Sequence, residues 1–524
     1  MKTVSTVLIG VLLTFVDVTA QVRIPGPNTP EEWFAAGQRA VQEAKQLTLT
    51  KTQAKNVILF VGDGMSISTI TAARILEGQL RGESGEENRL SFEKFPYVAL
   101  SKTYTVDQQT PDSAPTMTAM VTGVKTNDRT LSVDQFVKFG EPDAAVVKKH
   151  ALKTVLEMAE EKGLSTGVVT TTRVTHATPA ACYAHIAERD WEGDKELPAG
   201  ATVPDIARQL IEFPFGNGLE VALGGGREYF LPNTLQDPEE GDKKGTRKDG
   251  RDLTQEWLKK YPNAAFVWNR AQFTAINAAT TNHLLGLFER SHMEFEADRE
   301  KDTGGEPSLS EMTAKAIEVL QKNKKGFFLM VEGGRIDHGH HAGNAFRALT
   351  DAVEFAKAVH VARENTKRTE TLIIVTADHS HTFTIVGYPK RGNPILGKVV
   401  LPDKTEPERD MLGRPYTTLS YANGPGYTGE SHNEDGSTNP QGAKTFPHRP
   451  RKYTGITAGR PDLQGVDTTS PNYLQESTVP LGQETHAGED VAIYADGPLA
   501  HLIHGTLEQN VIAHVIMEAL RLKR

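Results

Sequence analysis

Five strand-like runs, most of them apolar along their whole length, constrain the fold of this chain more than any other feature. They occupy residues 56–62, 165–172, 221–226, 326–334 and 371–377. Between them lie segments with helical periodicity, among them residues 152–163, 205–213, 310–323 and 345–365. Apolar strands that alternate with amphipathic helices are typical of a parallel sheet covered on both faces. The sequence therefore predicts an α/β fold, a three-layer sandwich with a large, mostly parallel central sheet.

Size and composition suit one large globular domain with insertions, or two to three smaller domains. Of the 524 residues, 38% are hydrophobic and 24% are charged, and the formal net charge is −9. This acidic balance argues against a broad nucleic-acid-binding surface, so we expect no nucleic-acid partner. The single cysteine, Cys182, cannot form an internal disulfide, and we expect it to be a buried packing residue.

The first 20 residues have the pattern of a signal peptide. Lys2 precedes a short apolar run at residues 7–16, and Val18-Thr19-Ala20 supplies small residues for cleavage after Ala20. The run is short for a bilayer span, and neither another long apolar run nor a GPI signal follows. We expect an exported protein, periplasmic or secreted, without a membrane span; an uncleaved anchor is the alternative.

Two segments interrupt the alternation of strands and helices within the expected mature chain, residues 21–524. Residues 232–310 are polar and charged and are predicted to be an insertion. Residues 390–484 are rich in Gly, Pro, Ser and Asn and show little periodicity. We predict that this second segment is a loop-rich subdomain covering the edge of the sheet or a partner.

Side chains of the kind that bind metals follow the predicted strands. In open α/β sheets, ligands bind beyond the carboxyl ends of the strands, so these side chains are expected to meet at one rim. A later residue, His486, precedes another strand and could close the site from a different side. The residues that follow the strands are Asp63, His176, Thr178, Glu332, Asp337, His338, His341, Asp378 and His379.

Each of these motifs taken alone has an ordinary structural explanation. Asp and Asn after a strand often cap the next helix, and the sequence VGDG alone is more typical of a turn than of a ligand. The conjunction favours a metal site, because independent capping would not select Asp, His and Glu together at strand ends. Imidazole with carboxylate suits zinc, and oxygen ligands suit magnesium. Two zinc ions about 4 Å apart could clamp an in-line displacement at phosphorus.

A candidate nucleophile lies in the segment PDSAPT, where Asp112-Ser113 precedes a run of helical character. On this segment alone, Ser113 is better explained as a helix N-cap. The same geometry also suits catalysis, because a helix N-terminus attracts phosphate and a metal-bound hydroxyl becomes a nucleophile.

With these motifs in order, the chain closely resembles the alkaline phosphatases, particularly the animal type and its bacterial relatives. The resemblance runs from about residue 30 to the C-terminus and includes NVILFVGDGM, PDSAPT, VVTTTRVTHATPAA, FFLMVEGGRIDHGHH, VTADHSHTF and ETHAGEDVAIYADGP. It implies a phosphomonoesterase that acts at alkaline pH through a phosphoserine intermediate. Two zinc ions, one magnesium ion, small phosphate monoesters as substrates and a homodimer are implied as well.

The resemblance also assigns roles to residues. Ser113 is implied as the nucleophile, and Arg189 as the arginine that clamps the phosphate. One zinc would be held by Asp337, His341 and His486, and the other by Asp63, Asp378 and His379. The magnesium would be held by Asp63, Thr178 and Glu332. Residues implied to lie close by without binding a metal directly are Asp112, His176, His338 and His381.

Animal-type members bind a structural calcium in the insertion. By resemblance its ligands here would be Glu239, the Phe288 carbonyl, Glu289 and Glu306, where Glu306 stands in place of the usual Asp. The segment 390–484 corresponds to the crown subdomain at the dimer interface, although it is divergent and longer. Residues 30–46 resemble the arm that embraces the partner subunit.

Three other functions must be weighed against this interpretation. A sulfatase would need Arg where Met117 stands in Ser113-Ala114-Pro115-Thr116-Met117, so the sequence argues against it. A phosphodiesterase would need room for a second ester group, whereas Arg189 favours a monoester dianion. A non-catalytic metal-binding protein could lose Ser113 and Arg189, yet both are present.

Overall fold

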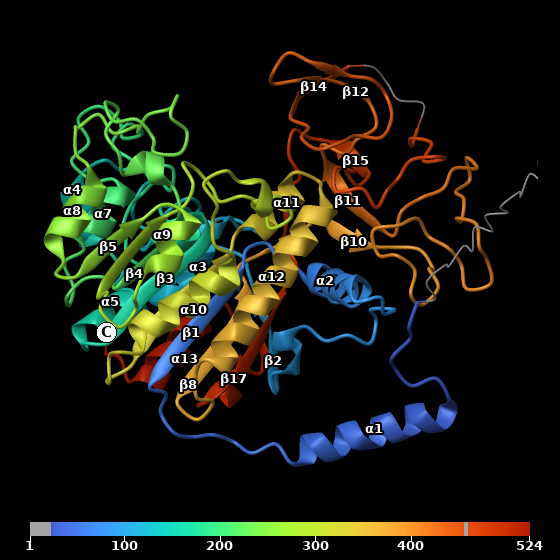
Figure 1. The fold of residues 1–524 in the computed structure, drawn as a ribbon, viewed down its shortest axis with the longest axis horizontal. Coiled ribbons are helices and arrows are strands. Elements are labelled where there is room, and N and C mark those ends of the chain that lie inside the picture. The colour runs from blue at the N-terminus through green and yellow to red at the C-terminus, as the bar shows by residue number, and fades with distance from the viewer. Residues whose placement is uncertain (1–21, 455–458, 524) are drawn as a thin grey trace, which may run out of the picture.

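The computed structural model describes residues 22–454 and 459–523 (Figure 1). The predicted signal peptide, residues 1–20, lies outside the described residues. A ten-stranded sheet forms the centre, and β17 alone runs antiparallel to its neighbours, β2 and β8. In spatial order its strands are β18 (Gly505–Glu508), β2 (Tyr97–Lys102), β17 (Val491–Asp496), β8 (Thr371–Ala377), β1 (Asn56–Gly62), β7 (Phe327–Gly333), β3 (Ser165–Arg173), β4 (Val221–Gly225), β6 (His283–Leu287) and β5 (Ala264–Val267).

Helices cover both faces of this sheet. One face carries α2 (Ile67–Leu80), α10 (Leu309–Leu320) and α12 (Ala345–Glu364), and the other carries α3 (Ser113–Thr122), α5 (Val155–Glu161), α7 (Ile206–Glu212) and α13 (Val511–Leu520). Strand β1 illustrates the arrangement: Leu59 packs into one core, and Ile58 and Phe60 pack into the other. Successive side chains of a strand point to opposite faces of the sheet. Because both faces of this sheet are covered, both sides of the strand must be apolar. The predicted α/β class is confirmed.

The register of the central strands sets where the site forms. Gly62 of β1 pairs with Gly333 of β7 and with Ala377 of β8, so the three strands end together. Residues directly after these ends, such as Asp63 and Asp378, therefore emerge side by side at one edge of the sheet.

The predicted insertion contributes to the sheet itself. Within residues 232–310 lie α8 (Leu253–Lys260), α9 (Arg270–Ala275), the edge strand β5 and its neighbour β6. Short elements elsewhere are α4 (Ala144–Lys149), α6 (Ala177–Ala180), α11 (Arg335–His341) and the β9 (Ser380–His381)–β16 (His486–Ala487) pair.

The segment after residue 380 forms small sheets at one end of the molecule (Figure 1). One contains β10 (Phe383–Ile385), β11 (Leu419–Gly424) and β15 (Ser477–Pro480), and the other contains β13 (Thr438–Asn439), β12 (Glu430–Asn433) and β14 (Pro450–Thr454). Long loops join these strands, as the composition predicts.

The first helix, α1 (Pro30–Lys45), stands away from the body of the protein (Figure 1). It begins with a capping box in which Thr29 and Glu32 satisfy each other's backbone N–H groups. None of its residues is buried, and Trp33 and Phe34 are 53% and 69% exposed. Within the described residues, no helix combines the length and apolar character that crossing a membrane requires.

Candidate active site

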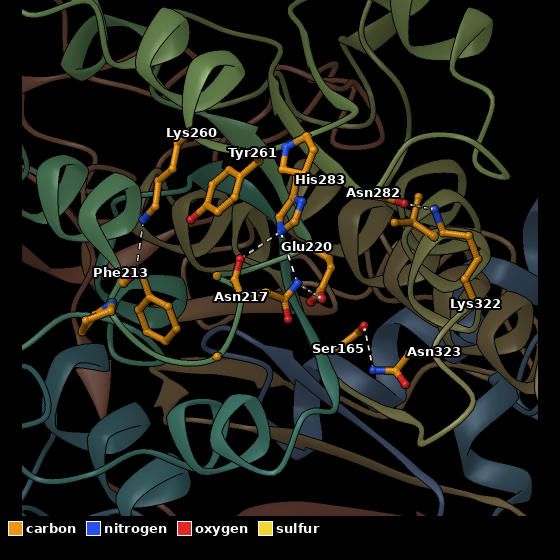
Figure 2. Close-up of a pocket in the computed structure, with 15 residues that line it drawn as sticks. Ser165, Phe213, Asn217, Glu220, Lys260, Tyr261, Asn282, His283, Lys322 and Asn323 are labelled. Carbon is orange, nitrogen blue, oxygen red and sulfur yellow. Dashed lines mark hydrogen bonds between the residues drawn. The ribbon is translucent and has the colours of Figure 1, made fainter.

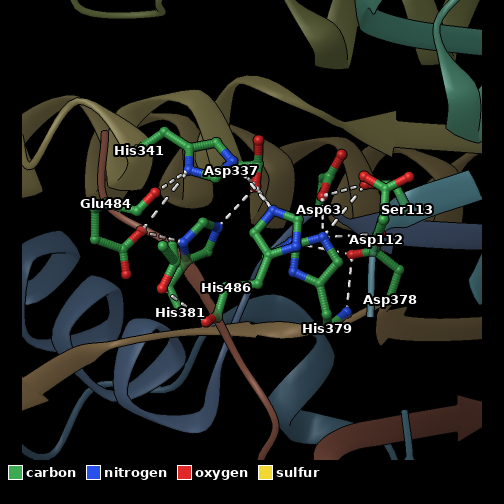
Figure 3. A network of polar contacts seen from close by, with 12 residues as sticks. Asp63, Asp112, Ser113, Asp337, His341, Asp378, His379, His381, Glu484 and His486 are labelled. Atoms are coloured by element: carbon green, nitrogen blue, oxygen red, sulfur yellow. Dashed lines mark hydrogen bonds and ion pairs between the residues drawn. The ribbon is translucent and has the colours of Figure 1, made fainter. Parts of the chain in front are cut away.

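The predicted metal-binding residues meet at the carboxyl end of the central strands (Figure 3). Asp63 follows β1, Glu332 lies in β7, and Asp378 and His379 follow β8. Asp337 and His341 lie on the short helix α11, one turn apart and therefore on the same side. The structure thus brings these residues together at the edge of the sheet where the strands end.

One group is rich in imidazole nitrogens. Asp337, His341, His381 and His486 each place a ligand atom within 4.8 Å of the others. Nε2 of His486 lies 3.0 Å from Nε2 of His341 and 3.3 Å from Oδ1 of Asp337. Nitrogen and carboxylate ligands at this spacing suit zinc.

A second group surrounds the predicted nucleophile. Nε2 of His379 lies 3.2 Å from Oδ1 of Asp63 and 3.3 Å from Oδ2 of Asp378. The Ser113 hydroxyl lies 3.3 Å from His379 Nε2 and 3.4 Å from Asp63 Oδ1. The rings of His379 and His486 stack with centroids 3.6 Å apart, which places this group directly beside the first.

A third group is made of oxygens that lack partners. Oδ2 of Asp63, Oγ1 of Thr178 and Oε1 of Glu332 are buried without a hydrogen bond. Burial, with the charges of Asp378, Asp337 and Glu332, raises the pKa of Asp63 well above its ordinary value. Burial is also the main reason why the pKa of Glu332 rises to about 7. Unsatisfied buried oxygens are costly, and a hard cation would satisfy them, so these residues fit a magnesium ion.

Ser113 is not the cap of its helix, contrary to the simplest interpretation of the segment. Asp112 is the N-cap of α3 and accepts a hydrogen bond from the Ala114 amide at 3.3 Å. Ser113 is the first helical residue and is 3% exposed, and its hydroxyl faces the second group. Its side chain is thus free of a capping role.

The predicted phosphate clamp lies next to Ser113. Arg189 donates through Nη1 to Asp112 Oδ1 at 2.5 Å and through Nη2 to His176 Nε2 at 2.8 Å. Burial raises the pKa of Asp112, but the Arg189 guanidinium outweighs this effect and holds that pKa below its ordinary value. Asp112 therefore stays ionised and fixes the arginine.

Glu484 is a residue of the site that the sequence reasoning missed. Its carboxylate binds Nδ1 of His381 at 2.5 Å and the amide of Thr382 at 2.7 Å, while its carbonyl binds Nδ1 of His341. Burial lowers the pKa of His381, but Glu484 and Asp337 together raise it to about 10. The only available signal was its position two residues before His486 in the motif ETHAGED.

His176 and His338 lie beside the metal groups, as expected, together with His292, which was not predicted. The three rings have centroids 4.3–5.7 Å apart. An arginine faces one nitrogen of each: Arg189 faces His176, Arg335 faces His338 and Arg173 faces His292. Those nitrogens are consequently occupied by hydrogen bonds.

A separate acidic group lies in the predicted insertion. It joins Glu239 and Glu289 with Asp302, a residue not predicted, whereas Glu306 lies outside this group. The neighbouring Phe288 is buried just after β6. Burial and the charges of Glu239 and Asp302 raise the pKa of Glu289 to about 8. One oxygen of Glu306 is buried nearby without a partner.

A cavity of about 710 Å³ lies at the opposite end of the strands (Figure 2). Its wall includes Ser165 and His283, which begin β3 and β6. Two lysines in the wall already bind backbone carbonyls: Lys260 binds that of Ile211, and Lys322 that of Thr281. Both ammonium groups are therefore occupied, whereas Oη of Tyr261 and Nδ1 of His283 in the same wall are buried without a hydrogen bond.

Comparisons with known proteins agree with the site. The model of the alkaline phosphatase family matches residues 54–522. The chain is 46% identical over 501 residues to the tissue-nonspecific alkaline phosphatase of Gallus gallus, covering 94% of this chain and 89% of the relative. The chain is 44% identical over 500 residues to the tissue-nonspecific alkaline phosphatase of Homo sapiens, covering 94% of this chain and 88% of the relative.

A solved structure shows the same fold. The alkaline phosphatase of Thermus thermophilus superposes with a TM-score of 0.63 at 24% identity, covering 92% of this chain and 94% of that chain. At this identity the likeness concerns the fold. The family match and the two identities show that the chain belongs to the alkaline phosphatase family and is a phosphoric monoester hydrolase.

Proposed function

We propose that this enzyme hydrolyses phosphate monoesters by double displacement, with the phosphoryl group carried by Ser113. The observation that carries the proposal is the placement of the Ser113 hydroxyl. It lies at the start of a buried helix, faces Asp63 and His379, and has Arg189 beside it. A helix N-terminus and an arginine fork both favour a phosphate dianion.

The cofactors of the proposal are two zinc ions and one magnesium ion. Asp337, His341 and His486 would hold one zinc, and Asp63, Asp378 and His379 the other. Asp63, Thr178 and Glu332 would hold the magnesium. Bound there, such cations neutralise the clustered carboxylates, lower the pKa of hydroxyl groups and stabilise charge on the leaving oxygen.

The chain's own groups account for binding and proton movement. The Arg189 fork binds two phosphate oxygens while Asp112 and His176 hold it in place. The Ser113 oxygen attacks phosphorus, and the bond to the leaving oxygen breaks on the opposite side. The Ser113 hydroxyl faces Asp63 and His379, so a cation held by these residues would lower the pKa of the hydroxyl and its proton would pass to solvent. Water then enters from the side of His341 and His486, cleaves the phosphoserine and restores Ser113.

The test is Ser113→Ala, assayed with p-nitrophenyl phosphate at pH 9 before and after chelation, with zinc and magnesium added back. We expect turnover to fall by about three orders of magnitude while the metal content is unchanged. Ser308→Ala, which removes the N-cap of α10, is the matched control and should keep its turnover. Acid-quenched enzyme should carry one phosphoryl group on the peptide containing Ser113. Near-normal turnover of the alanine variant would refute the assignment.

We also propose a structural calcium ion held by Glu239, Glu289 and Asp302, with the Phe288 carbonyl and Glu306 close by. Among the residues that the structure describes, Arg227 alone forms an ion pair with these three carboxylates, and it binds Glu239 at 2.8 Å. Calcium should raise the Tm of chelated protein, and Glu289→Gln should weaken this effect. An equal rise in that variant would count against the site.

We further propose a homodimer of an exported protein, with α1 as the contact between subunits. The exposed Trp33, Phe34 and Val41 on a helix that has no buried residue support this proposal. Light scattering should give a dimer for the chain starting at residue 21 and a monomer when residues 22–49 are removed. Recovery of the protein from the periplasm or the medium, with Gln21 first, tests export and cleavage.

A further inference from the structure

A cavity of about 720 Å³ opens directly beside the nitrogen-rich metal group. One wall is made by α11 and its end, including His338 and His341. The facing wall comes from the loop-rich segment, where residues 446–450 line the space. The cavity therefore lies between the catalytic rim and the subdomain of residues 390–484.

The leaving group of a substrate is directed into this cavity. In an in-line displacement the attacking and leaving oxygens lie on opposite sides of phosphorus. Since Ser113 attacks from the side of Asp63 and His379, the leaving oxygen points toward His341 and His486. His341 is part of the cavity wall, so the rest of the leaving group occupies the cavity.

Arg335 brings an unneutralised positive charge to the inner wall. Its guanidinium carbon lies 3.7 Å from the ring centroid of Phe295, and Nη1 lies 3.0 Å from Nδ1 of His338. Its Nε is buried without a hydrogen bond, and among the described residues no carboxylate oxygen comes within ion-pair distance. A buried guanidinium with a free N–H is a ready receptor for an anion.

Arg449 brings a second free charge to the outer wall. Its side chain is exposed, and across residues 22–454 and 459–523 it forms neither an ion pair nor a side-chain hydrogen bond. The adjacent His448 is held by Asn439 at 3.1 Å, and burial lowers its pKa to about 4, so it is uncharged. Among the residues lining the cavity, Glu434 is the single carboxylate.

The walls are also anchored to each other. Phe295 from the core side and Phe446 from the facing segment meet edge to face at 6.0 Å. Arg347, which is paired with Asp298 at 2.7 Å, lies 3.9 Å over the Phe446 ring. The cleft therefore carries two cations, Arg335 and Arg449, and one carboxylate, Glu434. This local excess of positive charge contrasts with the net charge of −9 for the whole chain.

We propose that this cleft is a second anion-binding subsite, which selects phosphate esters whose leaving group itself carries a carboxylate or a phosphate. Arg335 and Arg449 would bind that second anion. The proposal rests on the phosphomonoesterase function proposed above and names its preferred class of substrate. An arginine that is not already paired with a carboxylate can favour substrates with a second anion over those without one, because its hydrogen bonds to an anion are charge-assisted.

The test compares, in each of two pairs, a substrate that carries a second anion with one that does not. In the first pair the second anion is a carboxylate, and 3-phosphoglycerate is compared with glycerol 1-phosphate. In the second pair it is a phosphate, and magnesium-buffered pyrophosphate is compared with p-nitrophenyl phosphate. In Arg449→Gln we expect the ratio of kcat/KM within a pair to fall about tenfold, mainly through KM. The matched control is Arg451→Gln, which removes the same charge two residues away on β14, outside the cavity.

Each outcome decides the matter. If the ratio of kcat/KM falls in Arg449→Gln for one pair only, the result supports the subsite and identifies the second anion as a carboxylate or a phosphate. If the ratio falls for both pairs, the result supports a general anion subsite. An unchanged ratio in both pairs, or an equal change in Arg451→Gln, overturns it. If fully metallated wild-type enzyme fails to hydrolyse p-nitrophenyl phosphate and glycerol 1-phosphate, the proposed function fails instead, which is a distinguishable result.

Discussion

Replacement of Glu332 by Gln should have opposite effects on stability in metal-free and magnesium-loaded protein. Glu332 is fully buried and its Oε1 has no hydrogen-bond partner within the protein, while Thr170 and Thr172 bind Oε2. A glutamine keeps an oxygen for the two threonines and removes the charge. The hydroxyl of Thr178 lies beside this carboxylate and would accept a hydrogen bond from the new amide.

The magnitude follows from the pKa shift. The folded-state pKa of about 7 stands above the ordinary 4.5, so folding favours the protonated acid. Ionised Glu332 thus destabilises the folded protein, by under about 1 kcal/mol at pH 5 and by about 3 kcal/mol at pH 8. This destabilisation of the folded protein grows as the pH rises from about 4.5 and reaches its full value above about 7. For a chain of this length, the larger value corresponds to about 3 °C in Tm.

The assay is scanning calorimetry of chelated protein at one scan rate, at pH 5 and pH 8, and then with magnesium restored. Glu332→Gln should melt about 3 °C higher than wild type at pH 8 without metal, and nearly the same at pH 5. With magnesium it should melt lower, because the ion loses a charged ligand. A metal-free variant that melts below wild type at pH 8 would refute the reasoning.

Three further changes follow from the same geometry. Arg189→Lys should raise KM for p-nitrophenyl phosphate about tenfold or more in steady-state assays, because one ammonium cannot replace the two N–H groups of the fork. Glu484→Gln should weaken zinc binding about 10- to 100-fold in a competition assay with a chelator, since His381, which contacts Asp337, loses the carboxylate that orients it. Thr178→Val should leave the metal-free Tm nearly unchanged but raise the magnesium concentration for half-maximal activation about tenfold, measured by titration of chelated enzyme.

The parts of the site that the sequence could predict share one physical cause. Asp63, Asp378 and Glu332 lie in or directly after apolar strands, and strands that end in register bring such residues together. Local pattern is then enough to infer a spatial cluster. Ser113 was harder to interpret, because only the observed role of Asp112 as the helix cap frees the serine for another purpose.

Residues joined by long loops could not be inferred in this way. Glu484 binds His341 although the two lie 143 positions apart, in segments with no shared periodicity. Asp302 replaces the expected Glu306 in the acidic group because the loop that carries it has no repeating pattern to fix its path. Strands β5 and β6 have 4 and 5 residues, too few for their apolar pattern to stand out among charged loops.

The electrostatics of the metal-free site divide it into two unequal halves. Around Asp337, burial raises the pKa, but the charge of His341 and the hydrogen bonds from His381 and His486 outweigh it and hold the pKa well below its ordinary value. Around Asp63 and Glu332 the carboxylates face one another and have raised pKa values, so this half is not compensated. Imidazoles can act as acids or ligands, whereas clustered carboxylates have only a cation or a proton to relieve them. The proposed magnesium ion should therefore stabilise the oxygen-rich half most above neutral pH, where its carboxylates would otherwise repel one another.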